Sequence, residues 1–168
     1  MREVFTMWRH TKMVVLVALT AAVYAAILIP LKRIPLIPGI TELRPANVVP
    51  VVFSVLFGPA AAWGSAFGNL IGDFFGTLGP GSIFGFVGNF FYGLVAYKLC
   101  GKMGPLSSRE AMEAKGGRQI LEYLLLAFLA SAACAAFISW GVDLFGLVPF
   151  GVLGPVITFN NFLAAALI

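Results

Sequence analysis

Seven side chains stand out as candidates for binding a small molecule, because each is polar or aromatic and lies within or beside an apolar segment. They are Arg44, Asn47, Asn69, Asp73, Asn89, Trp140 and Asn160. Amide, carboxylate and guanidinium groups can fix a ligand by hydrogen bonds, and an aromatic ring can stack on it. A neutral heteroaromatic ligand would suit the amides and rings, an anion would favour Arg44, and a cation would favour Asp73.

Two of these residues, Asn69 and Asp73, are four positions apart and would share one face of a helix. An acidic side chain at the centre of a membrane helix costs about 2.5–3.5 kcal/mol on insertion scales, so it needs a function or a partner. Two interpretations stay open. These residues line a ligand pocket, or the asparagines bridge helices and Asp73 pairs with Arg44 as a structural lock.

Motifs for catalysis, metal binding and ATP hydrolysis are missing from the sequence. His10 is the single histidine and lies in a basic N-terminal stretch, and Cys100 and Cys134 lack the spacing of metal ligands. No GxxxxGK sequence followed by Ser or Thr occurs, so we expect no ATP hydrolysis by this chain. We therefore expect no metal, no cofactor and no enzymatic activity.

The composition identifies the class of protein. Of 168 residues, 60% are hydrophobic and only 11% are charged, whereas soluble domains carry about 25% charged residues. This excludes an ordinary soluble globule, a disordered chain and a nucleic-acid-binding domain. The apolar blocks are long and unbroken, unlike the alternating segments of about 10 residues in a membrane β-barrel. We therefore predict an all-α membrane protein that lies in the lipid bilayer.

The apolar blocks predict a six-transmembrane-helix bundle that forms a single integral membrane domain over residues 1–168. We place the helices at residues 12–30, 46–57, 59–76, 82–100, 119–142 and 150–168. A single helix over residues 46–76 would be about 46 Å long, longer than the roughly 30 Å hydrocarbon core. A turn at Gly58 and Pro59 that separates two helices is therefore expected. Residues 31–45 form a long, proline-rich outer loop.

The basic residues predict the orientation of the bundle. With six helices, 8 of the 11 lysines and arginines fall on the side of the two termini, and 3 fall on the opposite side. Cytoplasmic loops carry an excess of Lys and Arg. We therefore expect a multi-pass protein of the cell (plasma) membrane with both termini in the cytoplasm, and most of the candidate binding residues in its outer half.

Small residues recur at four-residue spacing on two of the predicted helices. Ala18, Ala22 and Ala26 form a stripe on the first helix, and Gly64, Gly68, Gly72 and Gly76 form a ridge on the third. Such stripes let helix backbones approach closely in lipid. We expect the glycine ridge to pack inside the bundle, whereas the alanine stripe could equally dock on an external partner.

These features together resemble the substrate-binding S component of energy-coupling factor (ECF) vitamin transporters. The resemblance covers nearly the whole chain. It rests on the alanine pattern of residues 18–26, the outer loop, the Phe57-Gly58-Pro59-Ala60 turn and the Gly72-Asp73 pair. Residues 44–47, Arg-Pro-Ala-Asn, are similar to members proposed to carry a queuosine precursor and to S components of unassigned substrate, so they do not assign the ligand.

The resemblance implies a function. The chain would capture a vitamin or related micronutrient near the outer surface, with residues 31–45 as the gate, and would topple in the membrane to release it inside. Ala18, Ala22 and Ala26 would dock on a transmembrane T component, and two cytoplasmic ATPases would supply the energy.

Two other classes of function remain as alternatives. A small intramembrane enzyme could use Asp73 and Asp143 as acids, but it would lack a nucleophile–base pair. The second alternative is a small scaffold or autonomous channel. A channel should carry polar residues along its full length, whereas here they favour one half.

Overall fold

The computed structural model describes residues 2–31, 35–37, 41–42, 44–76, 78–100 and 117–166. The helices are α1 (Arg2–Thr6), η1 (Met7–Arg9), α2 (Thr11–Leu31), η2 (Pro45–Asn47), α3 (Val48–Phe57), α4 (Pro59–Asp73), α5 (Gly81–Cys100), α6 (Gly117–Leu144) and α7 (Phe150–Ala166). The helical fold expected from the sequence is thus confirmed for the described ranges, and α2 to α7 overlap the six expected segments.

Helix lengths divide these elements into two groups. In the described part of the chain, three helices are long and apolar enough to cross a membrane: α2, α5 and the Gln119–Leu144 part of α6. Helices α3, α4 and α7 have 10, 15 and 17 residues. At 1.5 Å per residue these are about 15, 22 and 26 Å long, shorter than the hydrocarbon thickness of about 30 Å.

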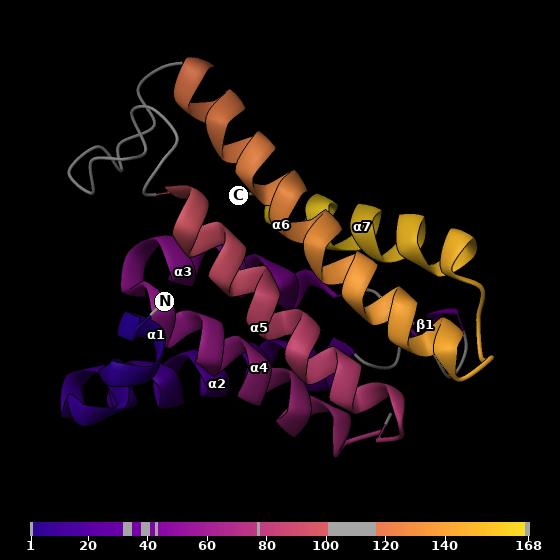
Figure 1. The fold of residues 1–168 in the computed structure, drawn as a ribbon, viewed down its shortest axis with the longest axis horizontal. Coiled ribbons are helices and arrows are strands. Elements are labelled where there is room, and N and C mark those ends of the chain that lie inside the picture. The colour runs from indigo at the N-terminus through magenta and orange to yellow at the C-terminus, as the bar shows by residue number, and fades with distance from the viewer. Residues whose placement is uncertain are drawn as a thin grey trace.

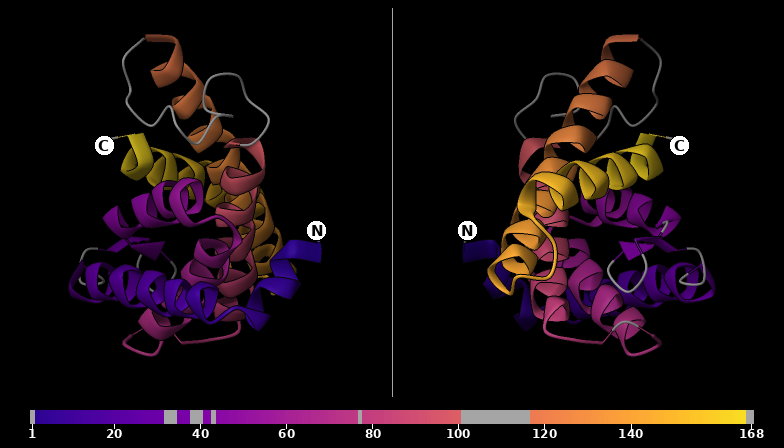
Figure 2. Two further views of the ribbon diagram at one scale, coloured as in Figure 1. Left: turned by 90° about the vertical axis from the view of Figure 1, so that its left-hand side faces the viewer. Right: turned by 90° about the vertical axis from the view of Figure 1, so that its right-hand side faces the viewer.

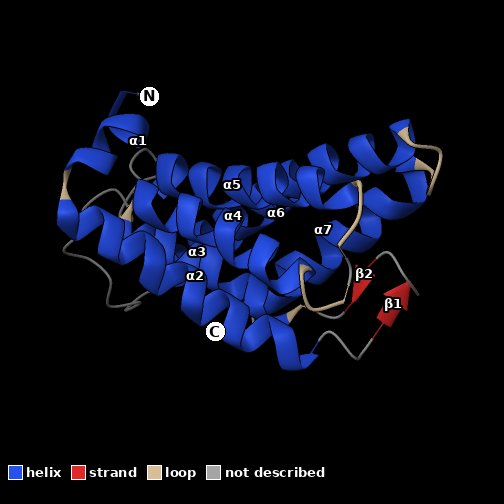
Figure 3. Cartoon of the chain, turned by 90° about the horizontal axis from the view of Figure 1, so that it is seen from below, coloured by secondary structure: helices blue, strands red, loops and turns tan. Residues whose placement is uncertain are grey.

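Two features were not expected. The N-terminal stretch forms α1 and η1, and α1 is attached to the bundle by an ion pair between Glu3 and Lys98 and by a 3.0 Å hydrogen bond from Trp63 Nε1 to the Val4 carbonyl. In the predicted gate, β1 (Pro35–Ile37) pairs antiparallel with β2 (Thr41–Glu42) at one end of the bundle (Figure 3). Residues 32–34, 38–40 and 43 of that gate lie outside the described residues, as do 167–168 of the last predicted helix.

The helices are arranged in a series in space. Helix α2 packs on α4, α4 on α5, α5 on α6 and α6 on α7, while α3 contacts α4, α5 and α7. Figure 1 shows α6 and α7 on one side of α5 and α2 and α4 on the other, and Figure 2 gives the two side views. The C-terminal ends of α2, α4 and α6 therefore lie at the same end of the bundle as the N-terminal ends of α3, α5 and α7.

The glycine ridge of α4 explains its close approach to α2. A Cβ atom at Gly64 would lie 2.4 Å from Cβ of Thr20, and one at Gly68 would lie 2.8 Å from Cδ1 of Tyr24. Real Cβ atoms do not approach other atoms so closely, so larger residues would force these helices apart. This is the internal packing expected for Gly64 and Gly68. Gly76, the last member of the expected ridge, instead lies beyond the end of α4, is exposed, and has nothing within 4 Å of an added Cβ.

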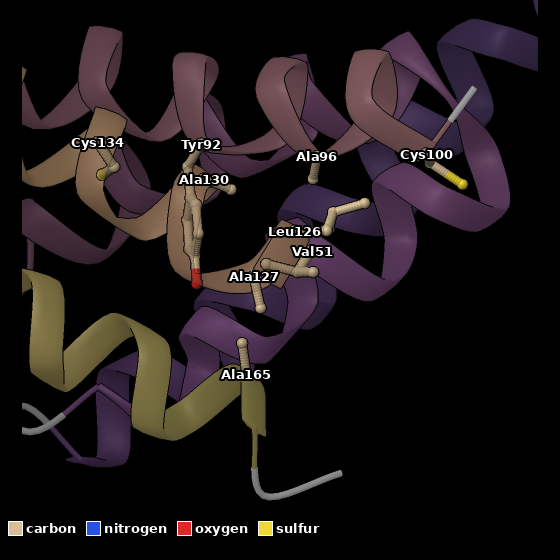
Figure 4. Packing of buried hydrophobic residues seen from close by; sticks show 9 residues of the cluster. All are labelled: Val51, Tyr92, Ala96, Cys100, Leu126, Ala127, Ala130, Cys134 and Ala165. Atoms are coloured by element: carbon tan, nitrogen blue, oxygen red, sulfur yellow. The ribbon is translucent and has the colours of Figure 1, made fainter. Parts of the chain in front are cut away.

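The largest apolar cluster lies where α3, α5, α6 and α7 meet. Its buried members include Val51, Tyr92, Leu126, Ala130 and Ala165, and Figure 4 shows them gathered between the four helices. Tyr92 is the polar member, and its hydroxyl donates to the Asn161 carbonyl of α7 at 3.1 Å. This hydrogen bond links α5 to α7, which otherwise packs on α6 and α3.

The turn at Gly58 separates α3 from α4. Its φ of 65° and ψ of −139° lie in a region that L side chains rarely adopt. Pro59 follows as the first residue of α4, where a helix needs no backbone N–H donor. The pair thus ends one helix and starts the next without an intervening loop.

Candidate functional site

A cavity of about 330 Å³ lies at the end of the bundle that carries the α4–α5 turn. Polar residues from four elements line it: Arg44 before η2, Asn47 in η2, Asn69 and Asp73 in α4, Asn89 in α5 and Asn161 in α7. Most of these side chains are buried. Five of the seven sequence-predicted residues are therefore brought together around one space.

A chain of charged and amide groups forms one wall of the cavity. Arg44 Nη1 donates to Asn69 Oδ1 at 3.0 Å, and Asn69 Nδ2 donates to Asp73 Oδ2 at 3.2 Å. The α-helical spacing of Asn69 and Asp73 positions both side chains on the face of α4 toward the cavity. The Asn69 amide thus links the Arg44 guanidinium to the Asp73 carboxylate. The wall therefore presents a positively charged donor and a negatively charged acceptor.

A second group of amides lies next to this wall. Asn47 Nδ2 donates to Asn161 Oδ1 at 2.5 Å, which joins η2 to α7. Asn89 Nδ2 donates to the Gly85 carbonyl at 2.8 Å, one turn back on α5. The hydroxyl of Tyr24 on α2 lies 2.6 Å from Asn47 Oδ1 and 3.2 Å from Asn89 Oδ1. These bonds hold the amides in fixed orientations.

Opposite the polar wall, apolar side chains of α6 and α7 complete the lining. They include Ile138 and Val142 of α6 and Ile157 of α7, with the thiol-bearing Cys134 nearby. Glycine at position 85 keeps room on the α5 side, because a Cβ there would lie 2.9 Å from Asn69 Nδ2. A cavity with one polar and one apolar wall suits a flat ring with a hydrogen-bonding edge.

The remaining two predicted residues lie elsewhere. Asn160 is buried, and its Oδ1 accepts a 3.5 Å hydrogen bond from the Arg44 backbone N–H, so it contacts the segment before η2 but is not part of the lining. Trp140 does not line the cavity. Its side chain is 53% exposed and borders a shallow apolar groove between α5 and α6 with Phe91 and Phe137.

Two contributors were missed by sequence reasoning. Asn161, adjacent to the chosen Asn160, lines the cavity, and Tyr24 supports two lining asparagines from behind. The Asn160–Asn161 pair was a signal for polar chemistry in this helix, but both residues are buried, and only the packing of α7 determines which one faces the cavity. Nothing in the sequence distinguishes Tyr24 from a packing residue, because an aromatic residue in an apolar helix usually serves only to pack.

The alanine stripe lies on the outside of the bundle. Ala18, Ala22 and Ala26 are exposed on α2. Their neighbours Ala21 and Ala25 are only 6% and 5% exposed and face inward. Helix α2 therefore presents small side chains on its outer face while its inner face packs on α4.

No metal site accompanies the cavity in the described residues, which contain no group of three or more His, Cys, Asp or Glu side chains placed to hold an ion.

Comparisons with known proteins identify the family. The family model described as QueT transporter matches residues 14–168, nearly the whole chain. Searches of curated proteins and of solved structures return no match. The matched range includes the alanine stripe, the cavity, α2 from its fourth residue and all the later helices. The chain therefore belongs to the QueT transporter family and is an ECF S component, a transporter subunit rather than an enzyme.

Proposed function

We propose that this S component captures a queuosine precursor, a base of the 7-deazaguanine type, in the cavity between α4, α5, α6 and α7. The family is one of queuosine precursor transporters. A guanine-type base is flat, and one edge carries an oxygen acceptor beside two N–H donor groups. The observation that carries the proposal is the Arg44–Asn69–Asp73 chain along one cavity wall.

The chemistry of that wall matches the edge of the base. The Asp73 carboxylate can accept from the ring N–H and the exocyclic amino group, as carboxylates accept two parallel donors. The amides of Asn47 and Asn89, or the guanidinium of Arg44, can donate to the ring oxygen. The apolar side chains of Ile138, Val142 and Ile157 would cover the faces of the ring. The cavity volume of about 330 Å³ lies at the lower end of the range for ligand pockets. A cavity of this size suits a single base.

The proposed transport cycle needs a partner that supplies energy. We assign Ala18, Ala22 and Ala26 as the docking surface for a T component, because small exposed residues let a second helix approach closely in lipid. Two ATPases bound to that T component would drive release, since the sequence lacks a Walker motif. Residues 31–45 would close over the cavity as a gate.

The same proposal places all six helices α2 to α7 in the plasma membrane. Helices α3, α4 and α7 would then complete their spans with the adjoining turns and with η2. The cavity would face outward and the termini inward, in agreement with the excess of Lys and Arg toward the termini.

A direct titration tests the proposed ligand. The purified chain is titrated calorimetrically with 7-deazaguanine and, as a matched control, with 7-deazaadenine, which lacks the ring oxygen and reverses the donor pattern of that edge. We expect 7-deazaguanine to bind at least about 10- to 100-fold more tightly, because each hydrogen bond to a charged group contributes about 1.5–3 kcal/mol. Equal affinities, or binding of neither base, would contradict the proposal.

A further inference from the structure

Tyr24 connects the outer helix of the bundle to the cavity. Its side chain is fully buried on α2, and its hydroxyl lies 2.6 Å from Asn47 Oδ1 and 3.2 Å from Asn89 Oδ1. Both asparagines line the cavity, whereas Tyr24 lies behind them. The Tyr24 hydroxyl therefore bonds to other elements of the bundle, whereas the Thr20 hydroxyl of the same helix donates within α2.

The two acceptors compete for one proton. A tyrosine hydroxyl carries a single hydrogen, so at any moment it donates to Asn47 or to Asn89 but not fully to both. A ligand oxygen that accepts from the Asn89 amide, as proposed above, turns that amide away from the Gly85 carbonyl and changes the position of its oxygen, so the Tyr24 proton is directed toward Asn47. Asn47 is itself held to α7 through the 2.5 Å bond to Asn161. Occupation of the cavity therefore selects one of two hydrogen-bond arrangements at Tyr24.

Any displacement of Tyr24 is transmitted to α2. Its ring packs on the glycine ridge of α4, where a Cβ at Gly68 would lie 2.8 Å from Cδ1 and 2.9 Å from Cβ of Tyr24. The packing leaves no space between ring and helix. Two residues before and after Tyr24, Ala22 and Ala26 are exposed on the opposite side of α2. A movement of the helix that follows the hydroxyl therefore also moves the alanine stripe.

We infer that Tyr24 is a positioning residue that couples ligand occupancy of the cavity to docking of the alanine stripe on its partner. This inference rests on the proposed function, since it requires both a ligand and a T component. Coupling between two sites is reciprocal, so a ligand that strengthens docking is itself bound more tightly by the docked protein. Tyr24 provides the physical element with two arrangements that both sites bias.

Tyr24→Phe tests this role, since it removes only the hydroxyl and keeps the ring that packs on Gly68. The matched control is Tyr123→Phe. Tyr123 lies on α6, and its hydroxyl donates to the Ala165 carbonyl at 2.9 Å, far along the chain from α2. The full-length variants are reconstituted in nanodiscs, and their affinity for the T component with its two ATPases is measured with and without saturating 7-deazaguanine.

The coupling ratio, the docking affinity with ligand divided by that without, is the decisive quantity. We expect a ratio of about five or more in the wild type and in Tyr123→Phe, because the coupling free energies typical of two linked sites correspond to at least this ratio. In Tyr24→Phe we expect a ratio near one, with docking in the absence of ligand unchanged. Unchanged docking also demonstrates that the variant is folded.

Other outcomes separate the inference from the proposed function. A Tyr24→Phe variant that keeps the wild-type ratio overturns the inference, and so does a wild-type ratio of one. A wild type that binds 7-deazaguanine but shows either of these results leaves the proposed function intact. A wild type that binds no 7-deazaguanine, or does not dock, overturns the proposed function and the inference with it.

Discussion

Asn69 Nδ2 lies 3.2 Å from Asp73 Oδ2, one helical turn away on α4, while its own oxygen accepts a 3.0 Å hydrogen bond from Arg44. The amide thus bridges a cation that precedes η2 and an anion of α4. Both alternatives raised by the sequence, a pocket and a structural link between Arg44 and Asp73, describe parts of this one arrangement. The link orients the carboxylate, and the cavity lies beside it.

Gly85→Ala should disturb this bridge. The added Cβ would lie 2.9 Å from Asn69 Nδ2, so the amide must turn away from Asp73. We expect 7-deazaguanine to bind about 10-fold more weakly, as the loss of one charge-assisted hydrogen bond implies. The measurement is calorimetric titration. Gly151→Ala is the control, because a Cβ there meets nothing within 4 Å, and equal weakening in both variants would count against the bridge.

Gly64→Ala should destabilise the packing of α2 on α4. Its Cβ would lie 2.4 Å from Thr20 Cβ and 2.8 Å from the Val17 carbonyl oxygen. Overpacking of this kind costs about 1–3 kcal/mol, and we expect a clear fall in the midpoint of thermal unfolding. The effect should be absent from Gly117→Ala, since position 117 has open space around it. An unchanged midpoint for Gly64→Ala would show that the two helices do not pack as described.

Ala22→Leu should block docking without affecting ligand capture. Leucine is tolerated in lipid, but its bulk keeps a partner helix at a distance. We expect at least a 10-fold loss of affinity for the T component, measured by co-purification and by binding in nanodiscs, with unchanged affinity for 7-deazaguanine. Ala136→Leu provides the control, because Ala136 is exposed on α6 rather than on α2. If Ala136→Leu weakens docking and Ala22→Leu does not, the docking surface lies on α6.

Much of the fold and site followed from sequence patterns whose physical cause is local. Apolar length predicts helices in a membrane protein. The four-residue spacing of Asn69 and Asp73 placed both side chains on one face of α4. The same spacing placed Ala18 and Ala22 on one face of α2. These inferences need only the geometry of a single helix.

The rest depends on how each helix is rotated about its axis, which packing decides. Trp140 points outward because the next residue, Gly141, is buried against Phe84, where a Cβ would lie 2.1 Å from the ring. That contact turns Ile138 and Val142 toward the cavity. The packing of α7 likewise decides that Asn161, rather than Asn160, lines the cavity. The α1 helix was also missed, because a five-residue helix with both charges and apolar residues has no clear period.

Mass spectrometry of small molecules extracted from the purified protein tests the central claim most directly. Wild-type chain and Asp73→Asn are produced in the same cells, purified identically and denatured, and the released molecules are compared. Asparagine keeps the size of the side chain but removes the carboxylate that would accept from the base. We expect a 7-deazaguanine-type base in the wild-type extract and about 10-fold less or none in the variant. No such base in the wild-type extract, or equal amounts in both extracts, would contradict it.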